Sequence, residues 1–197
     1  DKRFSATIDQ NKYIFTTANS YNAIIGADGR FTVTDVQLNQ GIRLTHKYAV
    51  DYSNKEQKFL LPNPQTDVTT LEVTVKASPT ATVIDTYSLV SDTAKVTATS
   101  KVYFLYEEFD GRFEVQFGDN KVGYRPADGS QVILTSNISD GDLTNSAGVF
   151  QAIDTIGGYA EVSVVTTTAG YGGAVRESIE EIKYGAPKLY ETQNRAV

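Results

Sequence analysis

Most of this chain alternates between apolar and polar residues with a period of two, which is typical of half-buried β-strands. The clearest row in the first half places one set of side chains on a single face: Ile42, Leu44, His46, Tyr48 and Val50. A second row follows at Leu71, Val73, Val75 and Ala77. We therefore predict long strands at 42–50 and 71–77, each with one buried and one exposed face.

The strongest hairpin signal lies in the second half of the chain. Its centre is Asp110–Gly111, a pair favoured in tight turns, and apolar rows flank it at Val102, Phe104 and Tyr106 and at Phe113, Val115 and Phe117. Shorter strands are expected at 4–8, 12–17, 31–33, 59–61, 86–90, 122–124, 132–134 and 160–164. The apolar phase slips by one residue before Val36, which predicts a bulge or strand end near Asp35.

One stretch changes period. Val175, Ile179 and Ile182 are spaced i, i+4 and i+7, as on one stripe of a helix, and Gly185 with Pro187 follows as a stop signal. We predict one amphipathic helix over about 174–184. About three turns are marginal alone, so we expect its apolar stripe to pack on a sheet.

These elements together predict the fold class and the domain organisation. The fold is expected to be mainly β, with one or more antiparallel β-sandwich-like domains and one short amphipathic α-helix near the C-terminus. Residues 1–41 would form a small β unit that remains from a preceding domain. Residues 42–197 would form a central β domain, with the closing helix at 174–184 and an exit connector at 186–197. A boundary near residue 95 stays open.

Composition narrows the possible functions. The net charge is −6 and no run of Lys or Arg reaches three, which argues against nucleic acid as a partner. No apolar run approaches the roughly 20 residues that span a bilayer, so no membrane partner is expected. Cysteine is absent, which excludes disulfides, thiolate catalysis and cysteine metal sites. A start at Asp1 without any methionine suggests a trimmed or processed piece of a longer protein.

Four acidic residues near the hairpin turn are candidates for catalytic groups: Glu107, Glu108, Asp110 and Glu114. A glycosidase uses two such carboxylates. However, adjacent strand residues point to opposite faces, and Glu114 alternates with apolar neighbours as an exposed hairpin residue would. We therefore favour solvent-exposed structural roles.

Three other features suggest chemistry only weakly. Asp140 and Asp142 lack the spacing of a calcium loop, and Gly170–Gly173 lacks the lysine and spacing of a phosphate loop. The single histidine, His46, is more typical of a partly buried side chain hydrogen-bonded to a backbone or hydroxyl group than of a metal ligand. We predict no catalytic residue, no cofactor, no metal and no small-molecule substrate.

Three stretches carry a resemblance to a known family. They are Lys58–Asn63 with Thr70–Val75, then Asp110–Asp119 with Gly123 and Asp128–Gly129, and finally Ala186–Val197. Over about 42–197 the chain resembles the baseplate wedge proteins of T4-like contractile-tailed bacteriophages, which belong with the baseplate J-like proteins. In that family the last stretch leads into a further domain, so the resemblance implies an internal fragment.

The resemblance implies a structural function. Wedge subunits join neighbouring wedge proteins and a second copy of themselves into the ring of the tail baseplate, in the virion, after assembly in the host cytoplasm. The outgoing connector would offer Tyr190, Gln193, Asn194 and Arg195 as interface residues. The guanidinium of Arg195 is suited to carboxylates or carbonyls of a neighbouring domain or subunit.

Two alternatives come from other functional classes. A secreted carbohydrate-binding or adhesin-like β-sandwich would use tyrosine-rich faces as its platform. A β-rich glycoside hydrolase would depend on Glu107 or Glu108.

Overall fold

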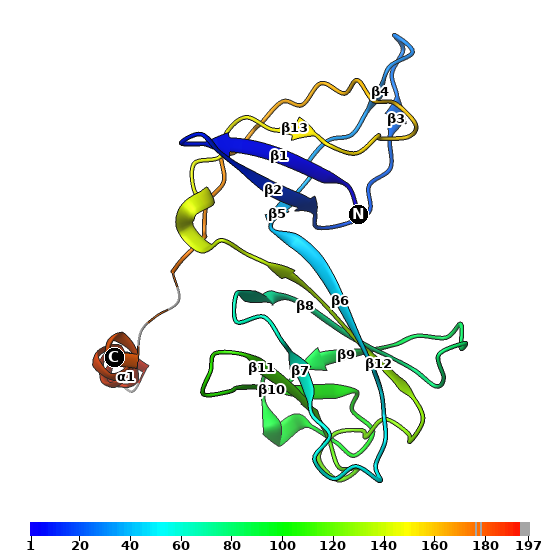
Figure 1. Ribbon diagram of the computed structural model, residues 1–197, viewed down its shortest axis with the longest axis vertical. Coiled ribbons are helices and arrows are strands. Elements are labelled where there is room, and N and C mark those ends of the chain that lie inside the picture. The colour runs from blue at the N-terminus through cyan, green and yellow to red at the C-terminus, as the bar shows by residue number, and fades with distance from the viewer. Residues whose placement is uncertain (176, 178, 194–197) are drawn as a thin grey trace.

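A computed structural model describes residues 1–175, 177 and 179–193, with backbone only at 179 and 188–193. The fold is mainly β, as the alternation predicts, and its strands form two lobes, one above the other in Figure 1. The upper lobe in that view holds the two chain segments 1–41 and 139–165, and the lower lobe holds the segment between them.

The lower lobe is one seven-stranded sheet in the order β6-β12-β8-β9-β10-β11-β7. All neighbours are antiparallel except β9 and β10, which are parallel. The strands are β6 (Ile42–Ala49), β7 (Phe59–Leu61), β8 (Thr66–Lys76), β9 (Asp85–Leu89), β10 (Val102–Glu107), β11 (Phe113–Phe117) and β12 (Gln131–Ile138). A short 3₁₀ turn, η1 (Thr93–Lys95), connects β9 to β10.

This sheet folds over on itself, so that its first and last strands meet. Tyr48 of β6 packs edge-on against Phe59 of β7, with ring centroids 5.8 Å apart, and its hydroxyl donates a hydrogen bond to the carbonyl of Leu60 over 2.5 Å. The two halves of the sheet thereby enclose one apolar core, in the manner of a β-sandwich. The core consists of Val50, Phe59, Leu61, Val73, Val75, Tyr87, Tyr103, Val115, Val132 and Leu134.

The upper lobe is a four-stranded antiparallel sheet in the order β13-β1-β2-β5. Its strands are β1 (Arg3–Ile8), β2 (Asn11–Thr17), β5 (Leu38–Gln40) and β13 (Gln151–Ala152), and η2 (Gly141–Thr144) precedes β13. A smaller core of Phe4, Ala6, Phe15 and Ala147 lies on one face, where the ring of Phe150 meets that of Phe15 edge-on at 4.9 Å. A separate two-stranded hairpin, β3 (Ile24–Ile25) with β4 (Phe31–Thr32), projects from this lobe (Figure 1).

The chain crosses between the lobes at two adjacent points, Gly41 and Ser139–Asp140, and Gln40 braces them together. Its Oε1 accepts hydrogen bonds from Ser139 Oγ and from the Asp140 backbone N–H, each at 2.8 Å. Its Nε2 donates to Asp140 Oδ2 at 2.7 Å. The lobes are thus joined by two strands that are cross-linked where they meet.

The long-range pairing groups the chain differently from the sequence-based division into 1–41 and 42–197. Phe4 and Ser5 of β1 pair with Ala152 and Gln151 of β13, so that a segment expected in the central domain shares a sheet with the N-terminal residues. Residues on both sides of position 95 lie in one seven-stranded sheet.

The helix differs from its expected bounds. The single described α-helix, α1 (Ile179–Gln193), begins later than 174 and continues through Gly185 and Pro187. A proline in a helix removes one hydrogen bond, and the residues that follow it, including Leu189 and Glu191, are good helix formers. The expected stop at Gly185 was therefore wrong.

The expected packing of the helix stripe was also wrong for the two of its side chains that the structure describes. Val175 is 70% exposed and Ile182 is 48% exposed, so neither is buried in a sheet. Figure 1 shows α1 beside the lobes, at the end of the extended segment that leaves the upper lobe.

Several local expectations are confirmed and others are not. The hairpin at 102–117 forms around its Asp-Gly turn as expected, and Gly111 has a φ of 87°, but Tyr103 and Leu105, not Phe104 and Tyr106, lie opposite Phe117 and Val115. β4 ends at Thr32 and Asp35 adopts a φ of 55°, which accounts for the slip in apolar phase. In contrast, residues 122–124 and 160–164 carry no strand.

Candidate functional site

The carboxylates near the β10–β11 turn are organised around one ammonium group. Lys58, just before β7, binds Glu108 and also Glu114, with its Nζ 2.9 Å from Glu114 Oε2. The Gln116 side chain donates a second hydrogen bond, of 2.8 Å, to Glu114 Oε1. Three adjacent strand segments therefore converge on one ionic cluster.

Glu114 is buried, with 7% of its surface exposed, so the expectation of an exposed hairpin residue was wrong. The alternation does place it on the face opposite Val115, but β11 is flanked by β7 as well as β10. Lys58 and Gln116 then cover the side chain. Burial of the Glu114 carboxylate is energetically tolerated because each of its oxygens has a charged or polar hydrogen-bond donor.

The electrostatics of Glu108 do not match an acid catalyst. The hydrogen bond from Lys58, followed by a hydrogen bond with Glu114, lowers the pKa of Glu108. The hydrogen bonds that Lys58 makes to Glu108 and to Glu114 raise the pKa of Lys58. A glycosidase acid needs a carboxyl group whose pKa is raised. The cluster instead serves as a clamp between β7 and the β10–β11 hairpin.

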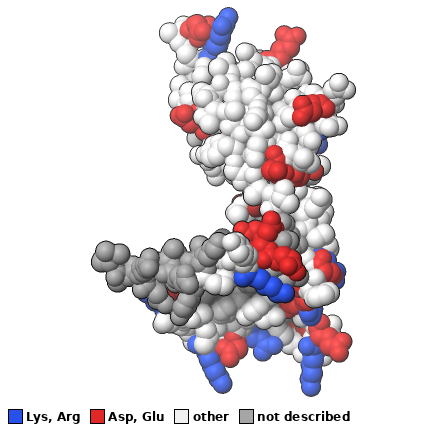
Figure 2. Space-filling model, turned by 90° about the vertical axis from the view of Figure 1, so that its left-hand side faces the viewer, with Lys and Arg blue, Asp and Glu red and all other residues white. Residues whose placement is uncertain are grey.

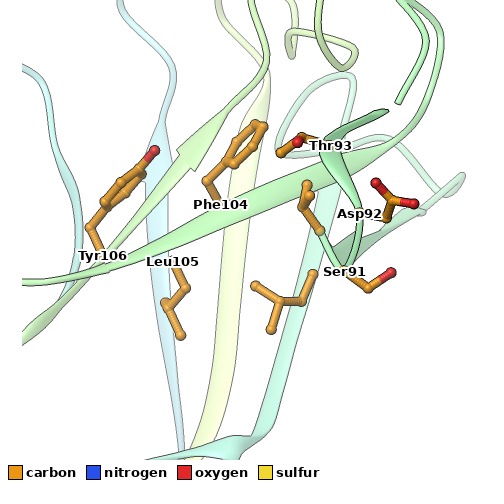
Figure 3. A pocket seen from close by; sticks show the side chains of 8 residues that line it. Ser91, Asp92, Thr93, Phe104, Leu105 and Tyr106 are labelled. Atoms are coloured by element: carbon orange, nitrogen blue, oxygen red, sulfur yellow. The ribbon is translucent and has the colours of Figure 1, made fainter. Parts of the chain in front are cut away.

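A shallow groove lies where β9 and β10 separate (Figure 3), with a volume of about 410 Å³. Pairing between the two strands ends at Tyr103 and Leu89, and the chain then turns into η1. Phe104 and Tyr106 extend to the same side of β10, and Leu105 to the other (Figure 3). This face was missed because the sequence-based reading assigned Phe104 and Tyr106 to the buried row, whereas Tyr103 is the buried residue.

The one charged side chain that lines this groove, Asp92, already has partners. Asp92 caps η1 by accepting a hydrogen bond of 3.0 Å from the Ala94 N–H, and its other oxygen lies 3.2 Å from Lys95 Nζ. The remaining lining is aliphatic, aromatic and hydroxyl in character. The groove is therefore suited to an apolar side chain rather than to a charged ligand.

No group of three potential metal ligands occurs among the described residues. His46 is half-buried on β6, opposite Leu134 of β12. The expected backbone or hydroxyl partner is not found for it in the described part of the chain.

Exposed apolar side chains occur over much of the described surface, for example at Val83, Phe109 and Val165, and some of them lie on two projecting elements. On the β3–β4 hairpin, Ile24 is 71%, Ile25 is 62% and Phe31 is 58% exposed. On α1, Ile182 and Tyr184 are 48% and 72% exposed. The hairpin contribution was missed by the sequence analysis, although Ile24–Ile25 before the Asp28–Gly29 turn was a usable signal.

The sequence-predicted interface residues lie at the C-terminal end. Tyr190 and Gln193 lie in α1, where only their backbone is described. Asn194 and Arg195 lie outside the described residues. Their role as a connector stays a prediction.

Charged side chains of both signs occur on the face that Figure 2 shows. Figure 2 shows Asp and Glu side chains on both lobes of the visible face, with Lys and Arg side chains interspersed among them. No described helix is both long enough and apolar enough to cross a bilayer.

Comparison with known proteins identifies no relative. No protein-family model matches the chain, and no curated protein is significantly similar to it.

Proposed function

We propose that this chain is a structural module of a baseplate wedge protein from a contractile-tailed bacteriophage, and that it acts by binding neighbouring proteins. The observation that carries the proposal is the placement of exposed apolar residues on two projecting elements, the β3–β4 hairpin and α1. Apolar patches on projecting elements are typical of protein–protein contact sites.

The stretches that resemble the wedge family support this proposal through their positions. Lys58 and the strand β7 hold the β10–β11 hairpin, which contains the Asp110–Asp119 stretch. The third stretch, from Ala186, forms the last part of α1 as far as Gln193. The first two stretches therefore stabilise the lower lobe, and the third belongs to one of the two projecting elements.

Binding by the hairpin is the part of this proposal that is most directly testable. A two-stranded hairpin of two residue pairs is marginal in water, and burial of Ile24 and Phe31 against a partner would stabilise it. The variant Ile24→Asp/Phe31→Asp should therefore fold normally and fail to join the wedge complex when the full-length protein is co-expressed with the neighbouring tail proteins.

The matched control is Val83→Asp/Ile84→Asp, which charges two apolar residues of similar exposure, 74% and 51%, on the other lobe. Co-purification followed by sedimentation would measure wedge formation. Normal assembly of the hairpin variant would show that the hairpin is not part of the interface. A parent gene without tail genes as neighbours would contradict the phage assignment itself.

A further inference from the structure

A tight turn in the upper lobe starts a β-hairpin that does not continue. Ile156 and Tyr159 exchange both backbone hydrogen bonds, at 2.9 and 3.0 Å, across Gly157–Gly158. The two glycines have φ values of 60° and 89°, which are those of a type I′ turn, the turn best matched to paired strands. Beyond this single bridge the two arms separate.

The space between the arms is a groove of about 640 Å³. One side is formed by Phe150 and the two residues of β13, and the other by residues 160–163. The second arm, Ala160–Val165, has the alternating pattern of a strand, yet it carries no strand in the structure.

The backbone hydrogen-bonding groups on the free edge of β13 point in the directions that a continuation of this turn would require. The Ile153 N–H donates to the carbonyl of Arg3, so Ile153 and Gln151 direct their backbone groups toward β1. Because these directions alternate, Ala152 directs its N–H and C=O toward the groove. If the register of Ile156 and Tyr159 continued along the two arms, Ala152 and Ser163 would form a hydrogen-bonded pair. Ile153 and Val162 would then lie opposite each other as a non-hydrogen-bonded pair.

A conflict of register explains why the arms stay apart. Val164 packs against the small core of the upper lobe, whereas Val165 is 83% exposed. In the register of the turn, Val165 would lie opposite Phe150 on the core face and Val164 would move to the other face. A shift of one residue exchanges the two faces of a strand, so the segment has two alternative positions.

We propose that residues 160–165 are a switchable strand of this protein, which closes onto the edge of β13 as a fifth strand of the upper sheet. Closure inserts Val165 in place of Val164, brings Val162 onto Ile153 and fills the groove. Closure changes the path of the chain only as far as Gly170, which is anchored to the upper lobe by backbone hydrogen bonds with Ser146 and Ala147. This inference stands independently of the proposed function.

The absence of cysteine makes a disulfide-trapping test clean. Ile153→Cys/Val162→Cys places the thiols at a non-hydrogen-bonded pair of the closed form, a geometry that suits a disulfide. Ile153→Cys/Ser163→Cys is the control, since Ser163 would point to the opposite face. We expect the first pair to oxidise at least about tenfold faster, which corresponds to at least about 1.4 kcal/mol in favour of the predicted register.

A third substitution separates closure from general flexibility. Val165→Asp, added to the Ile153→Cys/Val162→Cys double variant, should reduce the oxidation rate to that of the control, because closure would bury the charge. Thr168→Asp should not, because it lies outside the strand. Hydrogen exchange on the unmodified chain should show the Ser163 amide protected at least about tenfold over an unstructured amide. Equal oxidation rates for the two pairs, together with an unprotected Ser163 amide, would overturn the proposal.

Discussion

Gly41 sits at the crossing between the lobes, where only a residue without a side chain fits. Its φ of 115° lies in a region that L-residues rarely adopt, and a Cβ there would lie 2.1 Å from the carbonyl oxygen of Ile138. The Gly41 N–H also donates to the carbonyl of Ile14, and its C=O accepts from the Thr16 hydroxyl. Both strain and steric overlap therefore oppose any substitution.

We expect Gly41→Ala to lower the free energy of unfolding by more than about 2 kcal/mol, since the clash is with backbone and cannot relax by a side-chain rotation. Gly129→Ala is the control. Gly129 has a similarly positive φ of 73° but no atom within 4 Å of the added Cβ, so only about 1 kcal/mol is expected. Urea unfolding of the three proteins measures this difference, and equal losses would contradict the steric account.

Asp154 ties the N-terminal strand to the segment after β13. The Arg3 side chain donates to both carboxylate oxygens, at 2.7 and 3.1 Å, and the Arg3 backbone N–H adds a bond of 2.9 Å. These hydrogen bonds, and the charge of Arg3, lower the pKa of Asp154 to about 2 from its usual 3.8. The folded state therefore binds this proton less readily than the unfolded state does.

A depressed carboxyl pKa stabilises the fold above the unfolded pKa and ceases to do so as pH falls through the folded pKa. We expect the unmodified protein to lose about 1 kcal/mol more than Asp154→Asn between about pH 5 and pH 2, a value reduced for the partial exposure of the pair. Asp35→Asn serves as the control and should follow the unmodified protein. Parallel stability curves for Asp154→Asn and the unmodified protein would show that the contact is negligible in solution.

At the scale of elements, the sequence predicted the strands and turns that are determined by residues close together in the chain. The Asp-Gly turn and its flanking rows were sufficient for the β10–β11 hairpin, and the rows at 42–50 and 71–77 correspond to β6 and β8. The inner face of β10 was assigned one residue out of phase, because apolar residues occupy both of its faces and period two then becomes ambiguous.

The end of the helix could not be predicted from stop signals alone. Gly185 and Pro187 oppose a helix, yet α1 passes through both, with Glu180 and Glu181 in its favourable first turn. Its contacts were misjudged for a different reason. An apolar stripe indicates that a face becomes buried somewhere, and does not say whether the covering surface belongs to the same chain.

Because Ile182 is exposed, a charge on the apolar stripe of α1 should have little effect on stability, whereas a buried stripe would predict a large loss. We expect Ile182→Asp to change the free energy of unfolding by less than about 0.5 kcal/mol, as at other exposed positions. Val73→Asp, at a site with 0% exposure in the lower core, should lose more than about 4 kcal/mol. Thermal unfolding distinguishes the two. A large loss for Ile182→Asp would mean that the stripe packs internally, as the sequence first suggested.

At the scale of the whole molecule, the grouping of the lobes depends on contacts that no local pattern encodes. β1 and β13 pair across most of the length of the chain, and β13 contributes only two residues to the ladder. Such a short strand has no detectable period. The lower lobe was only partly easier to anticipate, because β8, β9, β10 and β11 pair with their neighbours in sequence, whereas β6, β12 and β7 pair with strands distant along the chain.

The two braced crossings also determine how the molecule transmits force. β6 and β12 leave the junction side by side and are paired over eight residues, from Ile42 with Ile138 to Ala49 with Gln131. A pull that separates the lobes therefore acts along these strands, and it loads the hydrogen bonds between β12 and β8 together, in shear, since those bonds run perpendicular to the strands. Single-molecule stretching between Gln10 and Asp119 should accordingly need more force than stretching between Tyr103 and Phe117, the pair at the open end of the hairpin, which opens the β10–β11 ladder one pair at a time. If the junction opened at a lower force than the hairpin, this account would be wrong. If it needs a higher force, the molecule is a stiff link that can carry tension between the partners bound at its two ends.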